Sequence, residues 1–102
     1  MTVSKVTQGR RLFDGEQPET PGDYVWLPYS GWDWKPSFFL GEGEWHVMDP
    51  TGGMGALGRT MIEKPSAHIW EVHNDGSVTF SPSLVMPSGW HGFLIQGVFN
   101  EC

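Results

Sequence analysis

Glycine and proline recur so closely along this chain that no long helix fits between them. The 102 residues include 14 glycines and 8 prolines, and both residue types destabilise the interior of a helix. No stretch of about ten or more residues places apolar side chains at the helical spacing of about 3.6 residues. The sequence therefore predicts an all-β protein with little or no helix.

Short runs of β-forming residues lie between these breaks. The clearest is His68–His73, followed by the turn 74–76 and a second extended run over 77–80. An Asp-Gly pair in such a turn is typical of a hairpin, because glycine adopts positive φ without steric cost. Further extended runs are predicted over residues 23–28, 37–40, 44–48, 84–86 and 93–99. Together they favour a small antiparallel sandwich or a partly open barrel of about six to eight short strands.

The length allows one domain, with no room for separate cofactor and substrate domains. We therefore interpret residues 1–102 as a single β-domain, with residues 1–20 as a loose N-terminal arm or, around Val3 and Val6, an edge strand. Residues 49–58 are rich in glycine and are interpreted as a flexible loop. Gly53 to Gly58 spell G-x-G-x-x-G, but Pro65 follows too soon for the long helix that a dinucleotide site requires.

The charge of the chain restricts its partners. Twelve acidic residues against six Lys and Arg give a net charge of −6. Proteins that bind nucleic acid or anionic membranes present basic surfaces, so we expect neither partner. The longest apolar runs, such as Phe38–Leu40, are far too short to span a membrane. The sequence predicts a cytoplasmic protein whose partner, if it binds by charge, has a basic surface.

Few residues have the spacing of a catalytic or metal site. Cys102 is the only cysteine, so neither an internal disulfide nor a cysteine zinc site is predicted. The four histidines show no close ligand pair, and we predict no metal and no cofactor. In the strand predicted over 44–48, Trp45 and Val47 are expected on one face, with Glu44, His46 and Met48 on the other.

Two alternatives place a small-molecule site on the same sheet. In the first, Trp32, Trp34 or Trp90 stack on sugar rings of a carbohydrate or on another small ligand. In the second, Ser83 and His91 act with an acid as a small hydrolase. A homodimer is a further hypothesis, because aromatic-rich faces tend to be covered.

The C-terminal half carries four short motifs in succession. They are Trp70–His73, Asp75–Thr79, Ser81–Leu84, and Gly89–Leu94 with Gly97. This order resembles a family of small phage and bacterial proteins of unknown function, whose phage members are often mislabelled "ammonia monooxygenase". Pro21-Gly22, Trp26 and Trp45–Met48 suit the first half of that family.

The resemblance implies a phage or mobile-element origin but no reaction. Its bacterial members carry a Cys-rich stretch that looks like a zinc site, whereas the corresponding residues here, 49–55, contain no cysteine. Zinc is therefore not carried over, and we expect turns of glycine and proline to hold this segment.

The leading hypothesis is a non-catalytic phage-type accessory protein. It would bind and occlude a basic surface of a host protein, such as a defence nuclease complex or the transcription machinery. Tryptophan is enriched in binding hot spots, and acids would supply complementary charge. The candidate contact residues, all expected at the surface, are Trp32, Asp33, Trp34, Glu42, Glu44, Asp49, Met54, Trp90 and His91, together with the 52–58 loop.

Overall fold

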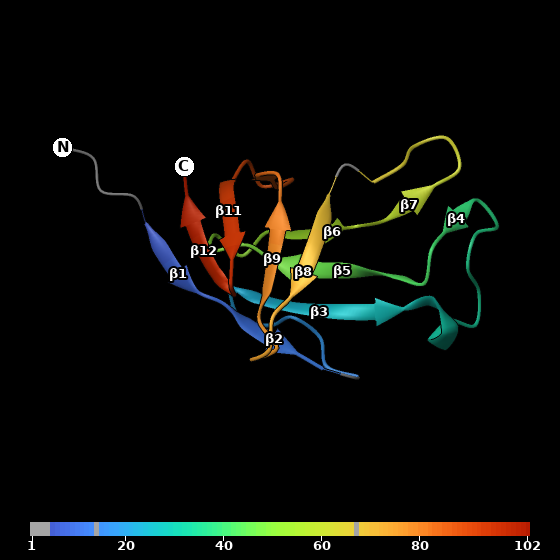
Figure 1. The fold of residues 1–102 in the computed structure, drawn as a ribbon, viewed down its shortest axis with the longest axis horizontal. Helices are drawn as coiled ribbons and strands as arrows, with labels where there is room; N and C mark the ends of the chain where they lie inside the picture. The colour runs from blue at the N-terminus through green and yellow to red at the C-terminus, as the bar shows by residue number, and fades with distance from the viewer. Residues whose placement is uncertain (1–4, 14, 67) are drawn as a thin grey trace.

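The computed structural model describes residues 5–13, 15–66 and 68–102. It is all-β, as predicted, and its sheets do not close into a barrel (Figure 1). The described residues contain twelve strands, more than the sequence predicted, because many are only two to four residues long. The elements are β1 (Val6–Gln8), β2 (Arg10–Leu12), β3 (Asp23–Pro28), the 3-10 turn η1 (Tyr29–Gly31), β4 (Phe39–Leu40), β5 (Gly43–Met48), β6 (Met54–Leu57), β7 (Thr60–Met61), β8 (Ile69–Val72), β9 (Val78–Ser81), β10 (Leu84–Val85), β11 (His91–Ile95) and β12 (Val98–Glu101).

Two four-stranded sheets make up most of the molecule. One has the order β1-β12-β11-β10 and the other the order β2-β3-β5-β6. The pairs β8-β9 and β4-β7 form two smaller sheets. Every described strand pair is antiparallel except β2 and β3, which run parallel.

The first two strands belong to different sheets, each at the sheet's edge, so of the two alternatives for this segment the structure has the edge strand around Val6 and not the loose arm. β1 pairs with β12 and β2 pairs with β3. Gly9 joins them, and a Cβ there would lie 2.5 Å from the carbonyl oxygen of Gly97. The segment is ordered because its backbone pairs on both sides of this glycine and Leu12 is buried.

Aromatic side chains from both four-stranded sheets and from β8-β9 fill the core. Trp45 lies at the centre, with its ring centroid 5.3 to 6.4 Å from those of Tyr24, Trp26, Trp70 and Phe80. The predicted alternation in β5 is confirmed, since Trp45 and Val47 belong to this core cluster. The other buried members are Leu57, Val78, Leu84, Met86, Trp90, Leu94 and Phe99.

The hairpin predicted around residues 74–76 is confirmed, and the extended run predicted over 93–99 forms a second hairpin. β8 and β9 pair around the predicted turn, where Gly76 has a φ of +86° and the Asp75 carboxylate accepts the Ser77 backbone N–H at 2.9 Å. β11 and β12 pair around Gln96 and Gly97, both at positive φ. Two consecutive residues at positive φ are the geometry that tight hairpin turns require.

The expectation of a flexible loop over residues 49–58 is wrong for residues 54–57. These residues form β6, which pairs with β5 from Trp45↔Leu57 to Met48↔Met54. The glycines serve close packing here: a Cβ on Gly55 would lie 2.8 Å from Met86 Cε, and one on Gly53 would lie 2.5 Å from Ser88 Cβ.

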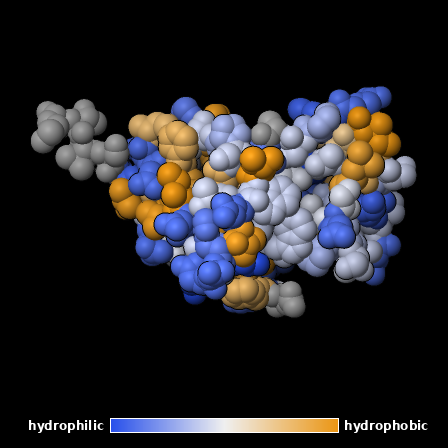
Figure 2. All heavy atoms as spheres, viewed as in Figure 1, coloured by the Kyte–Doolittle hydropathy of each residue, from blue (hydrophilic) through white to orange (hydrophobic). Residues whose placement is uncertain are grey.

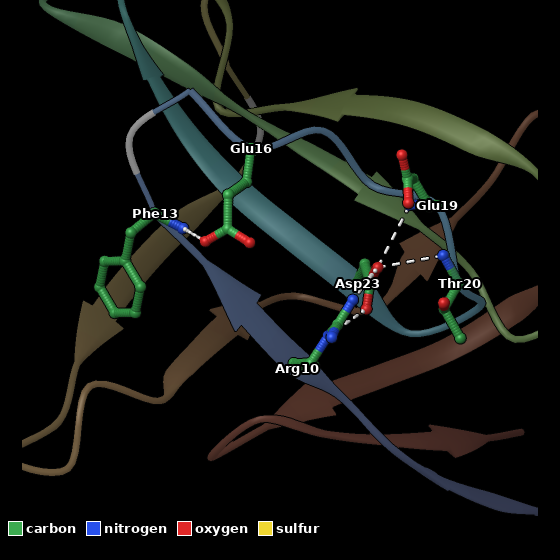
Figure 3. Close-up of polar contacts among 6 residues, drawn as sticks. All are labelled: Arg10, Phe13, Glu16, Glu19, Thr20 and Asp23. Carbon is green, nitrogen blue, oxygen red and sulfur yellow. Dashed lines mark hydrogen bonds and ion pairs between the residues drawn. The ribbon is translucent and has the colours of Figure 1, made fainter.

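A single carboxylate fastens the long connection before β3 (Figure 3). Asp23 is 1% exposed and pairs with the Arg10 guanidinium at 3.1 and 3.0 Å. It also accepts the backbone N–H groups of Glu19 at 3.2 Å and Thr20 at 3.0 Å. Hydrogen bonding from Arg10 is the largest cause that lowers the pKa of Asp23. Residues 19 and 20, which precede β3, are thus held against that strand.

The molecule is elongated, with principal extents of 49 × 28 × 25 Å. Figure 1 shows why: η1, β4 and β7 form one end that projects beyond the packed sheets. In the part of the chain that the structure describes, no helix is long and apolar enough to cross a membrane.

Candidate functional site

The structure distributes the predicted contact residues over two separate regions. Trp32, Asp33, Trp34 and Glu42 lie at the projecting end, in the segment between β3 and β5. Asp49 and Met54 lie at the turn from β5 to β6, and Trp90 and His91 lie next to it at the start of β11, since Ser88 bonds to Asp49. These residues therefore do not make one continuous contact surface.

Three of the residues expected at the surface are buried. Glu44 and Asp49 are each 0% exposed and Trp90 is 5% exposed. Trp90 packs against Phe99 in the core, with ring centroids 5.8 Å apart. The acids are internal because each accepts hydrogen bonds from segments that fold over it. Burial removes all three from direct contact with a partner.

Glu44 is the centre of a polar cluster on the side of β5 opposite Trp45. Its carboxylate accepts bonds from Arg59 at 2.8 and 2.6 Å and from the Tyr29 hydroxyl at 2.7 Å, and it lies 2.8 Å from His46 Nε2. Burial alone would raise the pKa of Glu44, but the bonds from Arg59, Tyr29 and His46 outweigh it and lower the pKa. Burial and the bond to Glu44 raise the pKa of Tyr29 to about 12.

This cluster ties the projecting end to the sandwich. Tyr29 belongs to η1, Glu44 to β5, and Arg59 follows β6. Arg59 also lies over the ring of Phe39 in β4, at 4.9 Å from its centroid. One carboxylate therefore fixes three segments, and its role is structural because its oxygens are already occupied.

Asp49 performs a similar task at the turn between β5 and β6. Its carboxylate accepts the backbone N–H of Thr51 at 2.8 Å and of Gly53 at 3.1 Å, the Thr51 hydroxyl, and the Ser88 hydroxyl at 2.6 Å. Burial opposes ionisation, but these bonds lower the pKa of Asp49. Glycine and proline turns alone were expected to hold residues 49–55; a buried carboxylate also does so, by joining them to the turn before β11.

Some of the exposed apolar side chains lie at the projecting end, while others, such as Val6, Ile69 and Val85, lie on the remaining sheets. We define the end face as Asp33, Trp34, Phe38, Ile62 and Glu63. Trp34 is 75% exposed, Ile62 62% and Phe38 50%. The Ile62 backbone N–H donates to the Phe38 carbonyl at 3.0 Å, so these two residues are held side by side.

A hollow of about 540 Å³ lies beside Phe38 and Ile62, with Met61, Glu63 and Lys64 as its other lining residues. Figure 2 shows orange, hydrophobic side chains at this end of the molecule and also at the opposite end and in the middle of the face. Monomeric proteins cover most such clusters, and an exposed one marks a contact surface.

The end face is less acidic than the sequence suggested. Its exposed acids are Asp33 and Glu63, while Lys35 and Lys64 lie in the same two segments. Lys35 Nζ donates to the Phe39 carbonyl at 2.9 Å and lies 5.6 Å from the centroid of the Tyr29 ring, so its charge is partly engaged within the protein. The face thus combines an apolar centre with a polar rim of mixed charge.

Ser83 and His91 are close enough for the hydrolase hypothesis, with His91 Nε2 3.1 Å from Ser83 Oγ. A catalytic base must also be oriented by a third group. Among the contacts of the described residues, no carboxylate bonds to His91. The pair lies at the surface, with Ser83 between β9 and β10 and His91 at the start of β11. The geometry corresponds to a surface hydrogen bond and lacks the remaining parts of a triad.

The three tryptophans of the carbohydrate hypothesis do not form one exposed binding surface. Trp90 is in the core, and Trp32 packs edge-on against Tyr29 with centroids 5.0 Å apart. Only Trp34 of the three presents most of its ring to solvent. Within the described residues, no group of three or more His, Cys, Asp or Glu side chains is placed to hold a metal ion.

Sequence reasoning did not single out Phe38 and Ile62, which the structure shows to be exposed. Phe38 stands in an apolar run whose alternation buries Phe39 and exposes its neighbours, and this is a signal that could have been used. Ile62 follows a two-residue strand and has no comparable pattern. Comparison of the chain with family models, curated proteins and solved structures finds no match in any of the three.

Proposed function

We propose that this protein is a non-catalytic, phage-type accessory protein that binds a host protein through the end face. The observation that carries the proposal is the set of exposed side chains there, Trp34, Phe38 and Ile62, at an end that projects from the packed sheets. Tryptophan is enriched among residues that dominate binding energy, and such anchors work best within a polar rim.

The charge of the chain favours a basic partner. The net charge is −6, and complementary potential speeds association and disfavours wrong partners. A host protein whose basic patch handles nucleic acid, in a defence nuclease complex or in the transcription machinery, meets this requirement. Occupying that patch would inhibit the host protein without any reaction.

The rigid attachment of the end face supports binding over catalysis. Glu44 and Arg59 fix the segments that carry the face, so its side chains need little ordering when a partner arrives. Preorganisation of this kind increases affinity because less conformational entropy is lost on association.

Trp34→Ala is expected to weaken capture of the partner about 30-fold, which corresponds to a loss of about 2 kcal/mol at a hot spot. The measurement is affinity purification from bacterial lysate with quantitative mass spectrometry, followed by titration of the enriched protein. Phe93→Ala is the matched control, since Phe93 is also an exposed aromatic residue but lies on β11.

The proposal requires a basic protein that both the wild type and Phe93→Ala enrich and that Trp34→Ala loses. Its binding should also weaken as salt is raised, because exposed charges are screened. Equal enrichment by all three proteins, or no enrichment by the wild type, contradicts the proposal.

A further inference from the structure

A second hollow lies where the projecting end joins the sandwich, and the proposed function does not use it. Its volume is about 350 Å³, within the range of small-ligand sites. Trp26 of β3 and Trp70 of β8 line it, together with Leu40, Glu42 and Thr60. We call it the tryptophan pocket. It is distinct from the hollow beside Phe38 and Ile62, with which it shares no lining residue.

Two glycines allow the indole rings to lie against the backbone. A Cβ on Gly58 would stand 2.5 Å from Trp70 Cζ3, and one on Gly43 would stand 2.7 Å from Trp26 Cζ2. Gly58 also has a φ of +80°, which disfavours other residues. The backbone next to both rings is therefore open only because side chains are absent there.

The two rings form a supported aromatic wall. Their centroids are 5.6 Å apart and their planes are inclined by 48°. Trp45 lies in the core beside both, at 5.3 Å from Trp26 and 6.4 Å from Trp70. Because Trp26 and Trp70 touch each other, a ligand lies against their open surface and not between them. Trp70 keeps 37% of its surface exposed for this contact.

The charges at the pocket favour a cation. Indole faces carry negative electrostatic potential and attract guanidinium and ammonium groups. Glu42 is the one charged residue that lines the pocket, and it makes no ion pair among the described residues. A sugar would need several polar groups around its ring, whereas the polar side chains here are those of Glu42 and Thr60.

A guanidinium group meets both features at once. It is planar, so it stacks on an aromatic face, and it can donate two parallel hydrogen bonds to one carboxylate. We propose that the tryptophan pocket binds an arginine side chain of the partner protein, stacked on Trp26 and Trp70 and paired with Glu42. This inference rests on the proposed function, because it identifies the basic group that the partner presents.

The test uses two peptides and needs no partner. Acetyl-Gly-Arg-Gly-amide and its citrulline counterpart have nearly the same shape, but only the first is charged. Titration of isotope-labelled protein is followed through the indole N–H signals in NMR spectra. We expect saturable shifts of the Trp26 and Trp70 signals with the arginine peptide. The citrulline peptide should bind at least about fivefold more weakly than the arginine peptide. Equal binding of both peptides, or no shift of these two signals, overturns the proposal.

Two variants test whether the arginine peptide is bound by the pocket or only attracted by the negative charge of the protein. Glu42→Gln is expected to weaken the arginine peptide about fivefold while leaving the fold intact, since Glu42 lies in an exposed turn. Glu71→Gln removes the same charge beside Trp70, but Glu71 pairs across from Thr79 while Trp70 pairs across from Phe80, so the two side chains lie on opposite faces. If both variants weaken binding of the arginine peptide equally, the proposal that the pocket binds arginine is contradicted.

The two proposals fail separately. Trp34→Ala should weaken partner capture about 30-fold but leave peptide binding unchanged, because Trp34 does not line the pocket. If Trp34→Ala loses partner capture but the wild type does not bind the arginine peptide, only the pocket is rejected. If the wild type binds the arginine peptide specifically and Trp34→Ala still captures the partner as well as the wild type does, only the end face is rejected.

Discussion

Glu44→Gln is expected to lower the free energy of unfolding by about 3 kcal/mol, near the lower end for breaking a buried ion pair. The variant keeps the shape of the side chain but leaves Arg59 without its charge partner. It also replaces an acceptor of bonds from Tyr29 and His46. Arg59 is partly exposed, with 37% of its side chain accessible, and water therefore limits the loss. Urea unfolding followed by tryptophan fluorescence measures the change.

Glu42→Gln is the matched control for this effect. It makes the same chemical change two residues earlier in the chain, but at an exposed position outside the ion-pair cluster. Its unfolding midpoint should remain close to that of the wild type. A similar loss of stability in the two variants would show that net charge, and not the buried cluster, controls the result.

The contribution of Glu44 should also depend on pH. Its pKa in the folded protein lies below the ordinary value of 4.5, so the folded state binds fewer protons than the unfolded state. The stabilisation is therefore complete above about pH 5 and is lost as the pH falls through the lowered value. The stability difference between wild type and Glu44→Gln should shrink steadily below pH 4.5. A difference that stays constant with pH would contradict this assignment.

Asp49→Ala is expected to lower the free energy of unfolding by about 3 kcal/mol, because it leaves several donors without their acceptor. Those donors come from Thr51, Gly53 and Ser88, and the last of these lies in the turn before β11, 39 residues further along the chain but in direct contact with Asp49. Ser88→Ala, which removes one donor, should cost about 1 kcal/mol. Thermal unfolding monitored by circular dichroism provides the comparison.

Asp75→Ala tests whether burial is the cause of the Asp49 effect. Asp75 accepts the same kind of bonds, from the backbone N–H and hydroxyl of Ser77, but in an exposed hairpin turn. Water can replace those bonds, so the midpoint should move little. If Asp49→Ala and Asp75→Ala lowered the stability equally, the bond between Asp49 and Ser88 that links the two turns would not be what stabilises the fold.

The hairpins were predictable because their determinants are local. Asp75 and Gly76 specify a turn, and alternation in the flanking runs places Phe80 on one face. The same logic placed Trp45 and Val47 together in the core. The short strands β4 and β10 lie within the extended runs predicted over 37–40 and 84–86, whereas the two residues of β7 cannot show a period.

The burial of Glu44 and Asp49 could not be predicted in this way. Alternation placed Glu44 opposite Trp45, but it cannot say what covers that face. Tyr29 and Arg59 do so, from segments about fifteen residues away on each side. The sequence likewise contained Trp26 and Trp70 without any sign that they would meet, because β3 and β8 belong to different sheets.

The pairing of β1 with β12 joins residues near opposite ends of the described chain, from Val6↔Asn100 to Gln8↔Val98. During synthesis, residues 6–8 therefore emerge early but have no strand to pair with until residues 98–100 are made. Proteins dominated by such distant pairings fold slowly, in milliseconds to seconds. The unpaired N-terminal strand of a nascent chain would be a target for chaperones or proteases throughout that interval.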